Sequence, residues 1–156
     1  MDKEIKNTFH TPDINADQYS PLTLAYMGYC AYEIVIRTLL VHKGNTHVDR
    51  LNKRASNLAK AGTQSQIVGV IQDSLTEEEL TIYKRGRNAK SYTSAKNASI
   101  NDYRRATGFE ALIGWLYLKG EFGRMTELIK LGFEGIGAEI LAGTESVEAS
   151  ESDTMQ

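Results

Sequence analysis

One carboxylate in this 156-residue chain lies among apolar residues, where burial of a charged side chain is unfavourable. Glu110 lies in the run TGFEALIGWLYL. Apolar residues recur around it at the spacing of one helix face: Phe109, Leu112, Ile113, Leu116 and Tyr117. Burying a carboxylate beside such a stripe costs on the order of several kcal/mol unless a positive charge meets it. Two interpretations are therefore open, an ion pair with Arg104, Arg105 or a basic loop residue, and a metal ligand.

The stretch before that helix is strongly cationic. Residues 84–96 (KRGRNAKSYTSAK) carry five Lys and Arg residues and no acid. Clustered positive charges attract polyanions, and contacts of this kind with phosphate groups bind without regard to base sequence. A solvated connector is the alternative interpretation. If the first interpretation holds, a phosphate-binding loop leads directly into the helix that carries Glu110.

Three runs together resemble the Mini-III ribonucleases: RGRNAK (85–90), KNA (96–98) and YRRATGFEALIGWLYL (103–118). These are short ribonuclease III relatives that have the catalytic domain and no separate double-stranded-RNA-binding domain. The resemblance extends over about residues 22–129. It implies an all-α ribonuclease III catalytic-domain fold, a homodimer, and Mg²⁺-dependent endonucleolytic cleavage of double-stranded or structured RNA. The RNA it implies is ribosomal, in maturation of the 23S precursor.

The resemblance also implies roles for single residues. Glu110 stands where the family keeps a catalytic, metal-binding carboxylate. Five residues match the family's substrate-contacting loop and are expected to bind RNA: Arg85, Arg87, Asn88, Lys90 and Lys96. Duplex RNA is recognised mostly through its shape, phosphates and 2′-hydroxyls, so we expect little base specificity. Tyr92 replaces a residue that is commonly small in the family.

The first helix of the resemblance departs from the family pattern. Its motif reads AYMGYCAYE (25–33), and Tyr29 occupies the position of the family's catalytic aspartate. A phenol with a pKa of about 10 is neutral at pH 7 and is a poor ligand for Mg²⁺. The two further acidic positions of ordinary ribonuclease III correspond to Ala25 and Thr107, which leaves Glu110 alone. Glu33, one turn beyond Tyr29, is a weak candidate for the missing ligand.

Three hypotheses follow. The chain is a dimeric, Mg²⁺-dependent endoribonuclease, or it is a catalytically impaired dimer that binds double-stranded RNA because Tyr29 replaces the aspartate. The third and weakest is a helical scaffold with no role in nucleic-acid binding.

The expected organisation is a flexible leader (1–18), a ribonuclease III-like domain (19–141) and a disordered acidic tail (142–156). Helical patterns run from Pro21, with Ser20 as N-cap, over 48–73 as one bent helix or two, from Thr76 to about Arg85, over 102–119 and over 121–141. Gly28 and Gly114 are expected to let the first of these helices pack closely on the Glu110 helix. Trp115 and Tyr117 are expected to fill the core or an interface.

Charge and composition add further expectations. The net charge is −2, yet residues 21–143 carry sixteen Lys and Arg against twelve acids, so the folded part is basic. One cysteine, no signal-peptide-like start and no run of about 18 apolar residues favour a cytoplasmic protein. His42 and His47 are five residues apart, which is not a ligand spacing fixed by one helix face.

Overall fold

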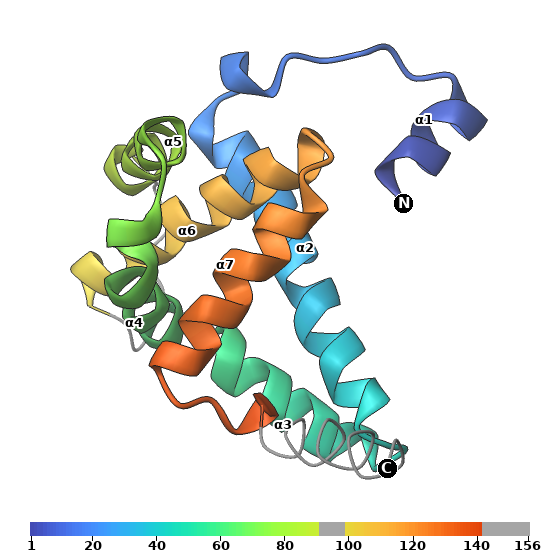
Figure 1. The fold of residues 1–156 in the computed structure, drawn as a ribbon, viewed down its shortest axis with the longest axis vertical. Coiled ribbons are helices and arrows are strands. Elements are labelled where there is room, and N and C mark those ends of the chain that lie inside the picture. The colour runs from blue at the N-terminus through green and yellow to red at the C-terminus, as the bar shows by residue number, and fades with distance from the viewer. Residues whose placement is uncertain (91–98, 142–156) are drawn as a thin grey trace, which may run out of the picture.

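Helices make up all the regular structure in residues 1–90 and 99–141, which are the residues that the structure describes. In the computed structural model these residues form seven α-helices and three short 3-10 turns, with no strand among them (Figure 1). The all-α prediction is confirmed. The elements are α1 (Asp2–Phe9), η1 (Ala16–Gln18), α2 (Pro21–His42), α3 (Val48–Ala59), α4 (Ala61–Ile71), η2 (Gln72–Ser74), α5 (Glu77–Asn88), α6 (Ile100–Leu118), α7 (Phe122–Gly135) and η3 (Glu139–Leu141).

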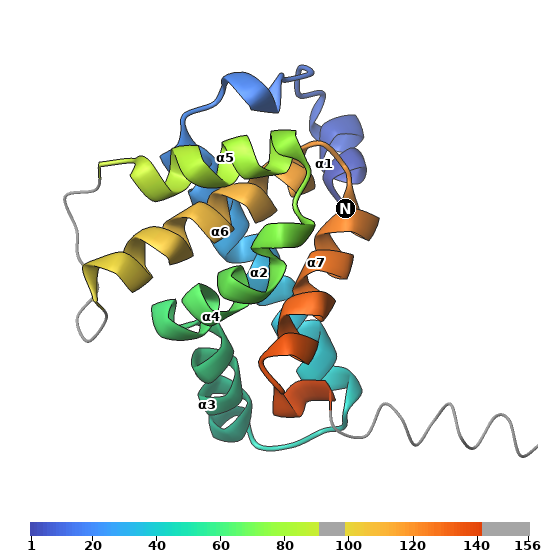
Figure 2. The same ribbon diagram turned by 60° about the vertical axis from the view of Figure 1, so that its left-hand side comes forward.

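Helix α6 is the centre of the fold. It packs against α2, α4, α5 and α7, and Figure 2 shows it running through the middle of the bundle beneath α5. All five residues of the predicted apolar stripe are buried, and every residue from 111 to 117 is buried as well. A helix that is covered on all sides must be apolar on all sides, which accounts for the run ALIGWLY.

Two glycines set the distance between α2 and α6. A Cβ added to Gly28 would overlap the backbone oxygen of Glu110, and one added to Gly114 would overlap the backbone oxygen of Leu24. The two helix backbones therefore touch, and only residues without a side chain fit at this crossing. The predicted packing is confirmed, and it occurs within one chain.

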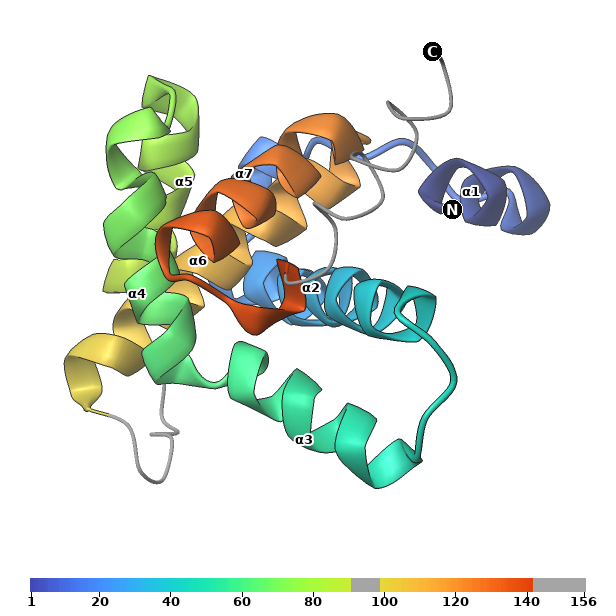
Figure 3. The same cartoon turned by 60° about the horizontal axis from the view of Figure 1, so that its bottom comes forward.

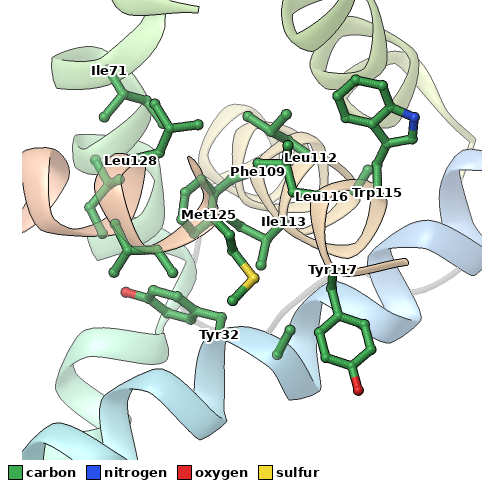
Figure 4. Close-up of a cluster of buried hydrophobic side chains, with 14 of the residues drawn as sticks. Tyr32, Ile71, Phe109, Leu112, Ile113, Trp115, Leu116, Tyr117, Met125 and Leu128 are labelled. Carbon is green, nitrogen blue, oxygen red and sulfur yellow. The ribbon is translucent and has the colours of Figure 1, made fainter. Parts of the chain in front are cut away.

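Aromatic and aliphatic side chains fill the space around the crossing (Figure 4). The ring of Tyr32 meets Phe109 edge to face, with centroids 5.2 Å apart and an interplanar angle of 89°. Trp115 and Tyr117 are buried, as expected. An edge-to-face pair adds about 0.5–1.5 kcal/mol to the stabilisation from burial, so this contact ties α2 to α6 beyond the glycine crossing.

Helix α2 is long and apolar enough to cross a membrane by length and composition alone, contrary to our expectation that no such run exists. Its best 18-residue window has a mean hydropathy of 1.3. One such helix is weak evidence for a membrane, because the core helix of a soluble protein passes the same test. Here the helix buries Leu24, Ile36 and Leu40 in the core and makes its largest contact with α6. Only 39% of that window is buried, so α2 contributes one face to the core and leaves other apolar side chains exposed.

The helix boundaries follow most of the predicted caps. Ser20 accepts a hydrogen bond from the backbone of Thr23 at the start of α2. The capping box between Thr76 and Glu79 is complete at the start of α5. Gly120 follows α6 with a φ of 72°, a left-handed conformation that favours glycine. The last helix ends at Gly135, before the predicted residue 141.

Residues 48–73 form two helices, and the break lies at Lys60, with φ −66° and ψ 151°. Gly62 and Gly69 both lie inside α4. The bend between α3 and α4 is visible in Figure 3. The sequence did not distinguish one bent helix from two helices in this region, and the structure contains two.

Residues 1–18 contain more regular structure than the loose leader that we expected. Helix α1 lies at the edge of the molecule and buries none of its residues (Figure 1). The turn η1 is attached to the core, since Trp115 Nε1 donates a hydrogen bond to Asp17 Oδ1 over 2.6 Å. Met1, Ile5 and Phe9 are spaced four apart, but a pattern of three residues is too short to predict a helix from the sequence.

Candidate active site

The carboxyl group of Glu110 lies at the junction of α6 with α2 and α4. Gln64 of α4 donates a hydrogen bond from Nε2 to Glu110 Oε1 over 3.1 Å. Burial raises the pKa of Glu110 to about 7, while the hydrogen bond from Gln64 acts in the opposite direction and is the smaller effect. The chain thus holds a poorly solvated carboxylate at its centre.

No ion pair to Glu110 is formed by a described Lys or Arg residue. Arg104 is exposed, and the guanidinium of Arg105 lies beside Gly69 of α4, where an added Cβ would be 3.4 Å from Nη2. Lys96 lies outside the described residues. Glu110 therefore forms no ion pair with Arg104 or Arg105, contrary to the first interpretation.

Tyr29 follows the glycine that touches the backbone of Glu110. Because Gly28 contacts α6 at Glu110, the AYMGY motif and the GFEAL motif meet at one helix crossing although they are far apart in sequence. The Tyr29 side chain is 53% exposed. The crossing therefore brings together the two positions at which the resemblance implies catalytic side chains.

Glu33 is already engaged with Arg37. The two form the expected i,i+4 pair, with 2.9 Å between Arg37 Nε and Glu33 Oε2. Burial holds the pKa of Tyr32 above its usual range, with Glu33 and then Glu110 as smaller contributors. Glu33 and Glu110 therefore both raise the pKa of Tyr32. Glu33 would have to break its ion pair with Arg37 in order to bind a metal ion.

Few further oxygen donors surround Glu110. Ala25 is buried, and the Thr107 hydroxyl donates to the Tyr103 carbonyl one turn back. Within residues 1–90 and 99–141, no group of three His, Cys, Asp or Glu side chains is placed to hold a metal ion. Mg²⁺ nevertheless uses only one or two carboxylates in many sites and completes its shell with waters and phosphate oxygens. Glu110 fits such a site as a single protein ligand.

The basic segment begins on a helix, because α5 extends to Asn88, past the expected end near Arg85. Gly86 permits this, since it is buried against Gly108 and Ala111 of α6. Arg87 lies over the ring of Tyr83 at 5.7 Å, and its Nε donates to Asn88 Oδ1 over 3.2 Å. Arg87 and Asn88 are thus held in the last turn of α5.

Arg85 has a structural contact that the sequence did not reveal. Its guanidinium donates to the backbone oxygens of Asp17, over 3.2 Å, and Tyr19, over 3.0 Å. Lys90 is exposed, while Lys96 and Tyr92 lie outside the described residues. Of the five predicted RNA contacts, the structure places four at or just after the end of α5.

Comparison with known proteins identifies the family of this chain. A family model described as the Ribonuclease III domain matches residues 22–121. The chain is 53% identical to the Mini-ribonuclease 3 of Clostridium tetani over 115 residues, which are 73% of this chain and 76% of the relative. The chain belongs to the Mini-ribonuclease 3 family. It is 46% identical to the Brevibacillus brevis member over 114 residues, or 73% of this chain and 85% of that one.

A solved structure has a similar fold. A crystal structure of a protein from Fusobacterium nucleatum matches with a TM-score of 0.69 and 31% identity, covering 76% of this chain and 94% of that one. The family match includes α2, α5 and α6, and so both Tyr29 and Glu110. The comparisons support an endoribonuclease of the ribonuclease III class.

The sequence did not point to Gln64 as part of the site. Thr63, Gln64 and Ser65 are three consecutive polar residues in α4, and all three are buried. Three buried residues in a row cannot share one face of a helix, so this end of α4 is enclosed on several sides. The sequence signal that could have pointed to it is the polar run TQSQ (63–66), which precedes the apolar half of α4.

Proposed function

We propose that this chain is a Mg²⁺-dependent endoribonuclease that cleaves double-stranded or structured RNA as a cytoplasmic homodimer. Its proposed substrate is the 23S ribosomal RNA precursor. The observation that carries the proposal is the half-buried Glu110 carboxylate, which meets no described cation at the crossing of the two helices that bear the family motifs. Such a group gains a partner when a cation binds beside it.

Glu110 would hold the ion, with waters and RNA phosphate oxygens as its other ligands. When bound, Mg²⁺ activates water and neutralises the charge that develops on the cleaved phosphate. The protein's own part is to bind and orient the RNA. Arg87, Asn88, Lys90 and Lys96 would contact phosphates, and Arg85 would add positive charge from its fixed position on α5.

The surface of α2 supports the proposed homodimer. Leu22, Tyr26 and Tyr29 are spaced four and three residues apart, and all three are exposed, Tyr26 by 76%. An apolar stripe of this kind is typical of an interaction surface. A dimer formed through α2 would bring two copies of the site together, so that one duplex could lie across both.

The second candidate is a dimer that binds double-stranded RNA without cutting it. The exposed phenol of Tyr29 favours it, because the family resemblance implies a carboxylate at this position and a phenol is a poor ligand for Mg²⁺. A single carboxylate would then have to hold the ion.

Cleavage of a long duplex RNA with Mg²⁺ tests the two candidates. The chain as it stands is compared with its Tyr29→Asp and Glu110→Gln variants. Cleavage by the unchanged chain and none by Glu110→Gln supports the enzyme; cleavage only after Tyr29→Asp supports the binding dimer. If no variant cuts or binds duplex RNA at low salt, both candidates fail and the scaffold hypothesis stands.

A further inference from the structure

Gln64 is the polar side chain that meets Glu110, and it is almost completely buried, with 1% of its surface exposed. Its amide nitrogen makes two hydrogen bonds, to the backbone oxygen of Ala59 over 2.8 Å and to Glu110 Oε1 over 3.1 Å. An amide has two N–H donors, so both are used.

These contacts fix the orientation of the amide. The Ala59 carbonyl can only accept a hydrogen bond, so the nitrogen of Gln64 must face it. The same nitrogen then faces Glu110, and the amide cannot be turned over without losing the Ala59 contact. Gln64 thus links the Glu110 carboxylate by hydrogen bonds to the backbone at the end of α3.

The amide oxygen of Gln64 has no hydrogen-bond partner among the described residues, although it is buried. An orphaned buried acceptor costs stability, and an apolar side chain of similar length would avoid that cost. The bond to Ala59 stabilises the end of α3, but the orphaned oxygen opposes that gain, so stability accounts for only part of the role of a glutamine at this position.

Resting on the proposed function, we infer that Gln64 is a positioning residue for the metal ligand Glu110. It holds Oε1 of the carboxylate in place and leaves Oε2, for which the described residues provide no hydrogen-bond donor, for the ion. Partners behind a metal ligand orient it, and their removal typically weakens metal binding by about 10–100-fold.

The test measures Mn²⁺ affinity from the free-ion signal in electron paramagnetic resonance, on the full chain and on the chain with Tyr29→Asp. Gln64→Met removes the amide and keeps the length of the side chain. Gln66→Met makes the same chemical change two residues further along α4, where the side chain is exposed. Thermal unfolding of each variant verifies that it is folded.

We expect Gln64→Met to weaken Mn²⁺ binding by roughly 10–100-fold and Gln66→Met to change it by less than about twofold. In duplex RNA cleavage with Tyr29→Asp present, Gln64→Met should lower kcat and leave KM for RNA unchanged. Excess metal should restore part of the activity. If Gln64 only supported the fold, its substitution would lower the unfolding temperature and would not lower kcat selectively while KM stays unchanged.

Two negative results are distinguishable. If Glu110→Gln abolishes Mn²⁺ binding while Gln64→Met has no effect, the positioning role is wrong and the metal site stands. If Glu110→Gln has no effect either, the metal site itself is wrong and the inference fails with it.

A measurement on the unsubstituted chain covers the case in which Gln64→Met does not fold. The side-chain amide signals of Gln64 in a nitrogen-15 spectrum should shift on addition of Mg²⁺, and those of Gln66 should not. An unmoved Gln64 signal in a chain that binds Mg²⁺ through Glu110 would overturn the inference.

Discussion

Gly28 lies against the backbone of Glu110, so that α2 and α6 touch where the two family motifs cross. An added methyl group at Gly28 would overlap main-chain atoms, which cannot move aside as a side chain can. We therefore expect Gly28→Ala to destabilise the fold by about 3 kcal/mol or more, measured by urea denaturation. Gly123→Ala is the control, since an added Cβ there meets nothing within 4 Å.

Stability should depend on pH through Glu110. Its pKa is about 7 in the folded protein against an ordinary value of 4.5, so the folded state favours the protonated form. The favourable contribution is complete below pH 4.5 and is lost as the pH rises to about 7, by up to roughly 3 kcal/mol. Glu110→Gln has no carboxyl group to titrate. We expect the variant to gain stability over the parent between pH 5 and pH 8 in chemical denaturation; a constant difference would contradict the burial of Glu110.

The ion pair between Arg124 and Glu79 links α7 to the start of α5. Arg124 donates to both oxygens of Glu79, over 2.9 and 2.8 Å, and Glu79 is only 3% exposed. Arg124→Met should cost about 3–5 kcal/mol at pH 7, because it leaves a buried carboxylate unpaired. The double variant with Glu79→Gln should recover part of that stability in the same denaturation assay.

Acid should weaken this pair. The hydrogen bonds from Arg124 are the largest cause that holds the pKa of Glu79 below its ordinary value of 4.5. The pair's contribution is therefore present above pH 4.5 and is lost as the pH falls through the lowered pKa. We expect the difference between parent and double variant to shrink below pH 4, and a difference that persists at pH 2 would contradict the role of the pair.

The basic segment should account for the salt dependence of RNA binding. We expect the combined change of Arg87, Lys90 and Lys96 to Gln to weaken binding to duplex RNA. For every RNA phosphate that the variant no longer binds, the slope of log affinity against log salt concentration should become shallower by roughly 0.7–0.9. Lys130→Gln, on an exposed position of α7, is the control. Unchanged binding by the triple variant would show that the segment does not contact RNA.

Arg85 should behave differently from its basic neighbours. It donates to two backbone oxygens of the segment that precedes α2, so Arg85→Met should lower stability by about 1–3 kcal/mol even without RNA. Thermal unfolding of the free protein measures this. If the variant binds RNA more weakly and unfolds as the parent does, Arg85 acts on RNA alone.

Most of the fold could be predicted from local signals. The caps at Ser20 and Thr76 and the apolar run of α6 are determined by residues close in sequence, and Gly28 and Gly114 are small residues within two helical patterns, although the crossing that they form is a long-range contact. The break at Lys60 and the turn η1 could not be predicted, because contacts from distant residues fix them, such as Asp17 with Trp115. Glu110 was found by its unusual setting; Gln64 was missed because a glutamine has no distinctive pattern until its burial is known.

The bend between α3 and α4 has no proline, and side chains from elsewhere satisfy the last three carbonyls of α3. Thr63 donates to Asn57, Tyr32 to Leu58 and Gln64 to Ala59. Helix α3 fully buries only Ala55 and packs Leu51, Leu58 and Ala59 partly against the core, so these end contacts add to its attachment. Because Gln64 also holds Glu110, the attachment of α3 and the order of the site form one cooperative unit. Local opening of α3 would release the carboxylate, and a ligand bound at Glu110 would slow amide hydrogen exchange in a helix that does not touch it.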